Sequence, residues 1–191
     1  MAKNGKIIVI SAPSGTGKST IINSILDAGD IDMQFSVSAT NRAPRPGEED
    51  GVNYHFLTTE QFRDAIAADE FVEWEQVYPG RYYGTLKSEL KNKSAEGHNL
   101  VLDVDVKGGV NVKKMFGPDA LSIFIMPPSI SILRDRLEHR ATDSPAVIAE
   151  RLDRAAYEIS FAPKYDITIV NDDLQTAIEQ TRKAITDFLN A

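Results

Sequence analysis

The stretch KIIVISAPSGTGKST, from Lys6 to Thr20, decides the fold of this chain. Its first half is apolar and β-branched, which predicts a buried strand. Apolar residues then recur at helical spacing from Ile21 to Leu26, and Gly29 is a plausible end for that helix. A strand, a glycine-rich loop and a helix, in this order, form the context that a phosphate-binding P-loop requires.

The chemistry of this loop suits a nucleoside triphosphate. Gly15 and Gly17 let the backbone turn its N–H groups toward an anion, and the N-terminus of the next helix adds positive potential. Lys18 can reach the β- and γ-phosphates, and the Ser19 hydroxyl can ligate Mg²⁺. Ala12 replaces the first glycine of the general pattern. The alternative is a chance glycine-rich turn, which the Gly-Lys-Ser sequence at the helix start disfavours.

The composition narrows the class of protein. A chain of 191 residues with 42% hydrophobic content suits one compact domain with appended segments. The net charge of −7 disfavours a nucleic-acid-binding surface, so a phosphate site must be a local pocket of arginines. The chain has no cysteine, which excludes disulfides and thiolate metal sites and fits a cytoplasmic protein. We expect neither a signal peptide nor a membrane-spanning segment.

Four apolar segments predict the strands of the core: residues 7–10, 100–105, 121–126 and 167–170. Helical patterns separate the last three, so we expect the α/β fold of the P-loop NTPases, a three-layer arrangement with a parallel sheet and helices on both faces. Substrates gather at the C-terminal ends of such strands. Ser14, Asp103, Met126 and Asn171 lie at or near these ends.

Two stretches interrupt this pattern and divide the chain. Residues 35–98 predict a mixed α/β insertion with a helix near Thr59–Ala68, capped by Thr59 and with Phe62 and Ile66 facing inward. Residues 128–163 predict two charged helices that form a mobile lid, the second with Ser144 as its cap and Pro145 at its first position. The core then comprises residues 1–34, 99–127 and 164–191.

The predicted insertion carries polar groups suited to a second phosphate. Arg42 and Arg45 lie three residues apart in a proline-rich loop, and paired guanidinium groups suit a phosphate dianion. Taken alone, two solvated surface charges are the better interpretation. Tyr54 and Tyr83 can donate phenol O–H groups, although each is individually more typical of a packing residue.

Glu73 indicates recognition of a base. It alternates with apolar neighbours, so either Glu73 or Trp74 points into an enclosed space, and a buried carboxylate needs donors. Guanine offers two adjacent donors, N1–H and the 2-amino group, whereas adenine has no such pair. The hydroxyls of Ser38 and Thr85 can contact the remaining edge. The alternative is an exposed strand carboxylate.

Asp103 and Asp105 end the second apolar segment. An acid at the end of an apolar strand beside a P-loop is typical of a Mg²⁺ site, and strand alternation sends both carboxylates to one side. A simple strand-end turn is the alternative.

Three arginines of the predicted lid, Arg136, Arg140 and Arg151, can neutralise charge on a transferring phosphoryl group. The alternative is surface charge paired with neighbouring acids.

Together these segments resemble the guanylate kinase family, in order and over essentially the whole chain. The likeness rests on residues 11–20, 35–42 and 44–48, and on Glu73-Trp74, Tyr82-Tyr83-Gly84, residues 102–105, residues 136–140 and residues 169–173. Asn41, Lys107 and Ala141 depart from residues common in the family.

The resemblance implies Mg²⁺-dependent phosphoryl transfer from ATP to GMP or dGMP. By position, Arg42, Arg45, Tyr54 and Tyr83 would hold the GMP phosphate, and Ser38, Glu73, Thr85 and Asp105 would address guanine. Ser19 and Asp103 would hold the metal. Lys18, Arg42, Arg136, Arg140, Arg151 and Asp103 would serve catalysis. ATP would contact Ala12, Pro13, Ser14, Gly15, Thr16, Gly17, Lys18, Ser19, Thr20 and Asn171.

Two alternatives remain. One is a protein-binding module of the same fold, but such modules typically lack the intact phosphate loop that this chain has. The other is a P-loop kinase for a different phosphorylated acceptor, such as a phosphorylated ribose. Glu73, Ser38 and Thr85 favour guanine over that acceptor.

Overall fold

A five-stranded parallel sheet forms the centre of the molecule in a computed structural model that describes residues 4–139 and 145–191. Its strands are β1 (Ile7–Ser11), β2 (Gln34–Phe35), β7 (Leu100–Asp103), β8 (Ala120–Met126) and β9 (Ile167–Val170). Their order in the sheet is β2-β7-β1-β8-β9, with parallel pairing throughout. The predicted parallel sheet is confirmed. The additional strand β2 has only two residues, which is too short for a hydrophobic period to indicate.

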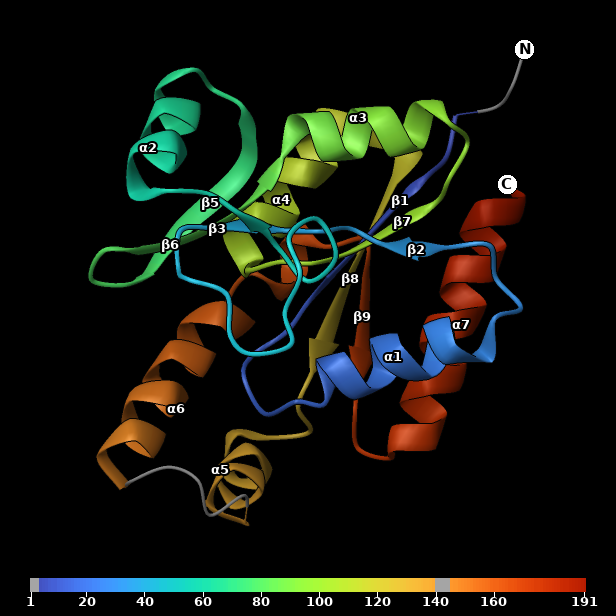
Figure 1. Cartoon of the computed structure of the whole chain (residues 1–191). Coiled ribbons are helices and arrows are strands. Elements are labelled where there is room, and N and C mark those ends of the chain that lie inside the picture. Colours follow the sequence, from blue (N-terminus) through green and yellow to red (C-terminus); the bar gives the residue numbers. More distant parts are fainter. Residues whose placement is uncertain (1–3, 140–144) are drawn as a thin grey trace.

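Helices cover both faces of this sheet (Figure 1). One face carries α1 (Lys18–Ala28) and α7 (Leu174–Asn190), and the other carries α3 (Lys87–Ala95) and α4 (Val106–Phe116). Alternate residues of β1 serve the two faces: Ile8 and Ile10 pack toward α1 and α7, whereas Ile7 and Val9 pack toward α3 and α4. Burial on both faces explains why β1 is apolar at every position before Ser11.

A second, four-stranded sheet lies beside the first. It consists of β3 (Ala39–Thr40), β4 (His55–Phe56), β5 (Phe71–Tyr78) and β6 (Arg81–Leu86), in the order β4-β3-β6-β5, with α2 (Thr59–Ala67) packed against it. The β3–β4 pair is parallel and the other two pairs are antiparallel. Residues 35–98 therefore contain the expected mixed α/β structure. Leu90 of α3 nevertheless packs into the central core, so the exact division of the chain stays a prediction.

The cap of α2 differs from the one expected. Thr58, not Thr59, is the N-cap: its hydroxyl oxygen accepts from the Gln61 N–H, and the Gln61 side chain accepts from the Thr58 N–H. This reciprocal pair satisfies two N–H groups at once, which favours a start one residue earlier. Phe62 is fully buried as expected, and Ile66 is only partly buried.

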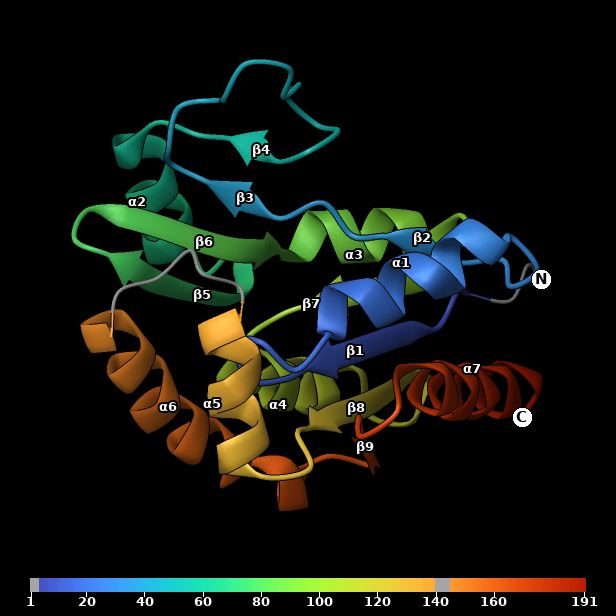
Figure 2. The ribbon, with the colours of Figure 1, turned by 90° about the horizontal axis from the view of Figure 1, so that it is seen from below.

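Two further helices, α5 (Ile130–His139) and α6 (Pro145–Ile159), lie side by side (Figure 2). They pack through Leu133, Leu137, Ile148, Leu152 and Ala155.

Arg140, Ala141 and the predicted cap Ser144 lie outside the described residues. Short 3₁₀ turns, Gly117–Asp119 and Ala162–Lys164, precede β8 and β9. None of the helices in residues 4–139 and 145–191 is long and apolar enough to cross a membrane.

Candidate functional site

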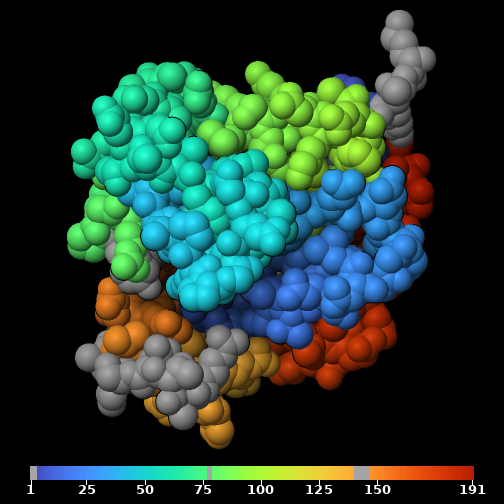
Figure 3. Space-filling view, in the orientation of Figure 1, coloured from blue at the N-terminus to red at the C-terminus, as the bar shows by residue number. Residues whose placement is uncertain are grey.

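Two cavities meet at the carboxyl end of β7, where Asp103, Val104 and Asp105 line both of them. One, of about 740 Å³, lies over the loop between β1 and α1, and we call it the P-loop cavity. The other, of about 310 Å³, lies between β7 and the second sheet, and we call it the Glu73 cavity. In the space-filling view, the surface is hollowed where the cyan, dark blue and orange segments meet (Figure 3).

Eight of the ten residues expected to contact ATP line the P-loop cavity, and Thr16 and Asn171 do not. Its lining comprises Ala12, Pro13, Ser14, Gly15, Gly17, Lys18, Ser19, Thr20, Asp103, Val104, Asp105, Val147, Glu150, Arg151, Arg154 and Glu158. The loop, the end of β7 and one face of α6 therefore surround one space.

Glycine is required at two points of this loop. Gly15 and Gly17 have φ values of +90° and +89°, which side chains rarely adopt. A Cβ at Gly15 would lie 2.9 Å from Leu137 of α5, and a Cβ at Gly17 would lie 2.7 Å from the Asn171 Nδ2. Tertiary packing thus adds to the local demand for glycine.

Asn171 braces the loop from behind. Its Nδ2 donates to the Thr16 carbonyl at 2.6 Å, while the Thr16 hydroxyl donates to the Pro13 carbonyl at 2.8 Å. Asn171 is 4% exposed, and its Oδ1 has no hydrogen-bond partner within the part of the chain that the structure describes. The expected contact of Asn171 with the ATP nucleoside stays a prediction.

Lys18 and Asp103 form an ion pair at the floor of the P-loop cavity. Ser19 and Asp103 offer a hydroxyl and a carboxylate, which are oxygen ligands that suit Mg²⁺. No group of three or more acidic, histidine or cysteine side chains that could hold a metal occurs among the described residues. Mg²⁺ in kinases typically has one or two protein carboxylates, with phosphates and water as its other ligands, so this donor set fits.

The predicted lid arginines are not all in the cavity. Arg151 lines it, whereas Arg136 lies outside its lining and donates to the Asp172 carbonyl at 3.3 Å. Arg140 falls outside the described residues.

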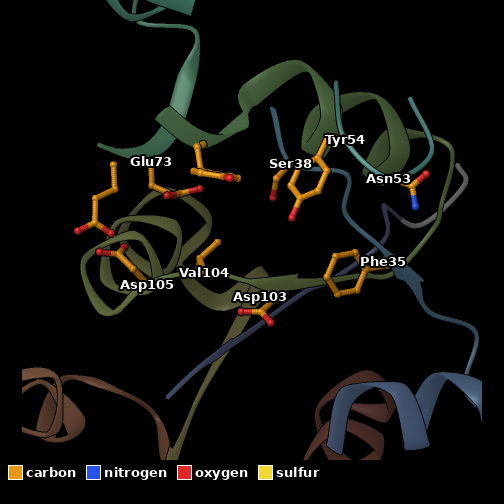
Figure 4. A pocket seen from close by; sticks show the side chains of 11 residues that line it. Phe35, Ser38, Asn53, Tyr54, Glu73, Asp103, Val104 and Asp105 are labelled. Carbon is orange, nitrogen blue, oxygen red and sulfur yellow. The ribbon is translucent and has the colours of Figure 1, made fainter. Parts of the chain in front are cut away.

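The Glu73 cavity gathers residues from distant parts of the sequence (Figure 4). Its lining comprises Phe35, Ser38, Asn53, Tyr54, Glu73, Glu75, Tyr83, Gly84, Asp103, Val104 and Asp105. Five of the eight residues expected to bind GMP are among them: Ser38, Tyr54, Glu73, Tyr83 and Asp105.

Glu73 is the most perturbed acid of this cavity. Burial raises its pKa to about 7, opposed by the Thr85 hydroxyl, which donates to Oε1 at 2.6 Å. Thr85 is 1% exposed, so it supports Glu73 from behind and does not line the cavity. A Cβ at Gly108 would lie 2.7 Å from the Glu73 Cγ, which shows how closely α4 approaches. Of the two residues that the sequence left open, Glu73 is the one that lines the cavity, and Trp74 is 45% exposed.

Asp105 reaches the cavity by a different route from the one expected. Strand alternation does not place it, because β7 ends at Asp103. Asp105 is instead the N-cap of α4, and its Oδ1 accepts from the Gly108 N–H at 2.7 Å. The cap leaves its other carboxylate oxygen for a second contact.

Arg42 lies beside the cavity with a protein partner. Its two terminal nitrogens donate to both oxygens of Glu48, at 2.6 and 2.7 Å, and its guanidinium lies 5.0 Å from the Tyr54 ring centre. The Arg42 hydrogen bond lowers the pKa of Glu48 to about 2, and the same pair raises the pKa of Arg42. The backbone N–H of Arg45 also donates to Glu48, while the Arg45 side chain is exposed.

Sequence reasoning missed several of these polar groups. Glu48 lies six residues after Arg42, and this spacing carries no recognised period. Glu158 lies four residues after Arg154, a helical ion-pair spacing that the sequence did offer. Glu75 lies two residues after Glu73, the spacing of one strand face. Its partner, Arg154, is 79 positions away in the sequence.

Comparison with known proteins agrees with this geometry. The guanylate kinase family model matches residues 4–188. The chain is 54% identical to a guanylate kinase of Bacteroides fragilis, over 96% of this chain and 90% of the relative. It is 53% identical to that of Porphyromonas gingivalis, over 96% and 98%.

Solved structures give the same result. The crystal structure of guanylate kinase from Anaplasma phagocytophilum matches with a TM-score of 0.70 and 34% identity, covering 98% of this chain and 86% of that one. A gluconokinase from Sinorhizobium meliloti 1021, at 13% identity and a TM-score of 0.51, shares the fold. The match of nearly the whole chain, at these identities, shows that the chain belongs to the guanylate kinase family.

Proposed function

We propose that this chain transfers the γ-phosphoryl group of ATP to GMP, and also to dGMP, giving ADP and GDP or dGDP. It would thereby serve purine nucleotide metabolism and GMP recycling in the cytoplasm. Membership in a family of kinases makes the chain an enzyme, and relatives at about half identity carry the name guanylate kinase.

One observation carries the proposal. The cavity over the P-loop and the cavity around Glu73 share Asp103, Val104 and Asp105, so a nucleotide in each would bring its phosphates toward the same strand end. Two cavities that meet at the carboxyl end of a parallel strand suit alignment of a donor and an acceptor.

In the donor half, backbone N–H groups of the loop and the Lys18 ammonium would hold the ATP phosphates. Lys18 is paired with Asp103, so it would exchange this carboxylate for phosphate oxygens. Arg151, on α6, lines the same space and would approach the transferring group. Arg136 and Arg140 would join it from the neighbouring helix and from the segment that follows.

In the acceptor half, the Glu73 carboxylate would accept from guanine N1–H and the 2-amino group. The Thr85 hydroxyl holds one of its oxygens, which leaves the other free for the base. Ser38 and Asp105 line the same cavity and would contact the remaining edge. Tyr54, Tyr83 and Arg42 are contiguous through ring contacts and would hold the GMP phosphate with Arg45.

A divalent metal would be held by Ser19 and Asp103, and we propose Mg²⁺. When bound, it would supply positive charge to the phosphates of ATP. The residues of the chain do the rest: they align two anions, neutralise their charge and exclude water. The acceptor is a phosphate oxygen that is already ionised near neutral pH, so the protein needs no strong general base.

The test is a coupled assay of ATP against a panel of nucleoside monophosphates, with and without Mg²⁺. We expect ADP formation with GMP and dGMP, and little with AMP, CMP or UMP. Turnover with a phosphorylated sugar, but not with GMP, would contradict the proposal. Absence of ADP with every acceptor, although both nucleotides bind, would favour a binding module of the same fold.

A further inference from the structure

One arginine joins the two cavities. Arg154 of α6 lines the P-loop cavity, and its Nη2 donates to both oxygens of Glu75 on β5, at 3.2 and 3.1 Å. Glu75 lines the Glu73 cavity. The Nε of the same guanidinium donates to Glu158, one turn along α6, at 2.9 Å.

We call the contact of Arg154 with Glu75 the bridge. The two acids that contact Arg154 differ in burial. The Glu158 side chain is 11% exposed, whereas those of Glu75 and Arg154 are 36% and 47% exposed. Burial raises the pKa of Glu158, and Arg154 opposes that shift. Glu158 therefore holds Arg154 against α6, and the contact with Glu75 links Arg154 to β5 of the second sheet.

The position of Glu75 gives the bridge a consequence. Glu75 is paired with Tyr83 across β5 and β6, and the Glu73–Thr85 pair lies two positions along the same ladder, beyond Trp74 with Gly84. A contact between α6 and Glu75 therefore attaches α6 to β5 two residues from Glu73, the carboxylate proposed to bind the base. Figures 1 and 2 both show α6 beside the end of the β5–β6 sheet.

We propose that Arg154 is a positioning residue that pre-organises the space between the nucleotides by tying α6 to β5 through Glu75. Ordering this space before binding lowers the entropy that the nucleotides must lose on closure. The inference rests on the proposed function, because the benefit appears as affinity for GMP in the presence of ATP.

The first experiment measures the bridge without activity. The chain has no cysteine, so Ala67→Cys on α2 and Ala156→Cys on α6 can carry two spin labels at exposed positions. Electron-spin distance measurements on the nucleotide-free protein should show one narrow distribution. Glu75→Gln should broaden it or shift it to longer distances, and Asp187→Asn, which removes an exposed ion pair within α7, should leave it unchanged. An unchanged distribution in Glu75→Gln overturns the proposal.

The second experiment separates positioning from direct contact with substrate. Glu75→Gln, Arg154→Ala and the double variant are compared for the KM of GMP and for kcat. Because the pair is half exposed, we expect each single change to raise KM about two- to fivefold with kcat little altered. The double variant should be no worse than Arg154→Ala, and the effect should shrink at high salt.

Additive losses would mean that Glu75 acts on GMP by itself, which contradicts a bridge. Arg154→Lys keeps the charge but cannot reach both carboxylates with a planar fork, so it should restore only part of the affinity. If no variant and no wild-type protein makes GDP, the proposed function fails. If wild-type protein makes GDP and Glu75→Gln has an unchanged KM, only the bridge fails.

Discussion

The P-loop cavity and the Glu73 cavity, which would each receive a phosphate group under the proposed function, differ in the groups that line them. One wall of the P-loop cavity is a run of neighbouring loop residues with two glycines at positive φ, and the end of β7 and α6 complete it. The Glu73 cavity is lined by residues from β2, β5, β6, the end of β7 and the loops before β3 and β4. A phosphate chain presents many equivalent oxygens, which a backbone loop can hold, whereas a base edge needs donors and acceptors at particular points.

The second difference concerns charge. Lys18 in the P-loop cavity and Arg42 beside the Glu73 cavity each have a carboxylate partner, Asp103 and Glu48. Glu73, by contrast, accepts from the neutral hydroxyl of Thr85, and burial raises its pKa. Under the proposed function, phosphate oxygens would replace these carboxylates at Lys18 and Arg42, and the Glu73 carboxylate would accept from the base.

The largest effect should come from removing Lys18, the first residue of α1 after the glycine-rich loop. Lys18→Ala should lower kcat about a hundred- to a thousandfold, because the charge on the transferring group loses its nearest ammonium. The affinity for GMP, measured by calorimetry without ATP, should remain close to wild type. Lys183→Ala, which removes an exposed lysine of α7, is the matched control. Near wild-type turnover in Lys18→Ala would show that the loop is not the donor site.

The next largest effect should come from the other cavity. Glu73→Gln keeps the shape but places an amide opposite the two guanine donors, so the KM for GMP should rise about 10- to 100-fold. The KM for ATP should change by less than about twofold. Glu70→Gln, an exposed acid beside the same strand, is the control. Equal losses for both nucleotides would make Glu73 a structural residue.

The raised pKa of Glu73 predicts a pH dependence in the same cavity. Guanine needs the ionised carboxylate, so the KM for GMP should rise as the pH falls below about 7, by about tenfold per unit. GMP itself gains a proton near pH 6, and this contributes equally to Glu73→Gln. The ratio of wild-type to variant KM across pH 5–8 therefore isolates the side chain, and a flat ratio would contradict its titration.

Lower pH, which should weaken GMP binding, should stabilise the folded protein when no nucleotide is bound. The pKa of Glu73 is higher in the folded than in the unfolded chain, so the folded state binds more protons between about pH 4.3 and 7. The stabilisation from this group is complete below pH 4.3 and is lost as the pH rises through 7. Urea unfolding of wild type and Glu73→Gln over this range measures the difference.

The smallest effect concerns the support of the loop. Asn171→Ala removes the donor to the Thr16 carbonyl and should lower the free energy of unfolding by about 1–3 kcal/mol. We expect Tm to fall by about 2–10 °C and the KM for ATP to rise, with the KM for GMP unchanged. A rise in the KM for GMP alone would break the assignment of Asn171 to the donor half.

The sequence predicted the parallel sheet, the P-loop and the mixed insertion, and each has a local cause. The apolar run of β1 follows from burial on two faces, and the left-handed Gly29 ends α1 as expected. The strand β2 was missed, because two residues carry no period. The cap of α2 was misplaced by one residue, because a capping box depends on the reciprocal pair of Thr58 and Gln61.

Features that depend on neighbouring residues could be predicted from the amino-acid sequence: the P-loop, the period of the main helices and strands, and the residue types suited to guanine. Which of these groups lie in contact follows from the packing of the whole chain. The pairing of Glu73 with Thr85, the placement of Asp105 as a helix cap and the contact of Arg154 with Glu75 depend on strand register and helix packing. These are set by burial over the whole core, because no short segment can bury its apolar face alone.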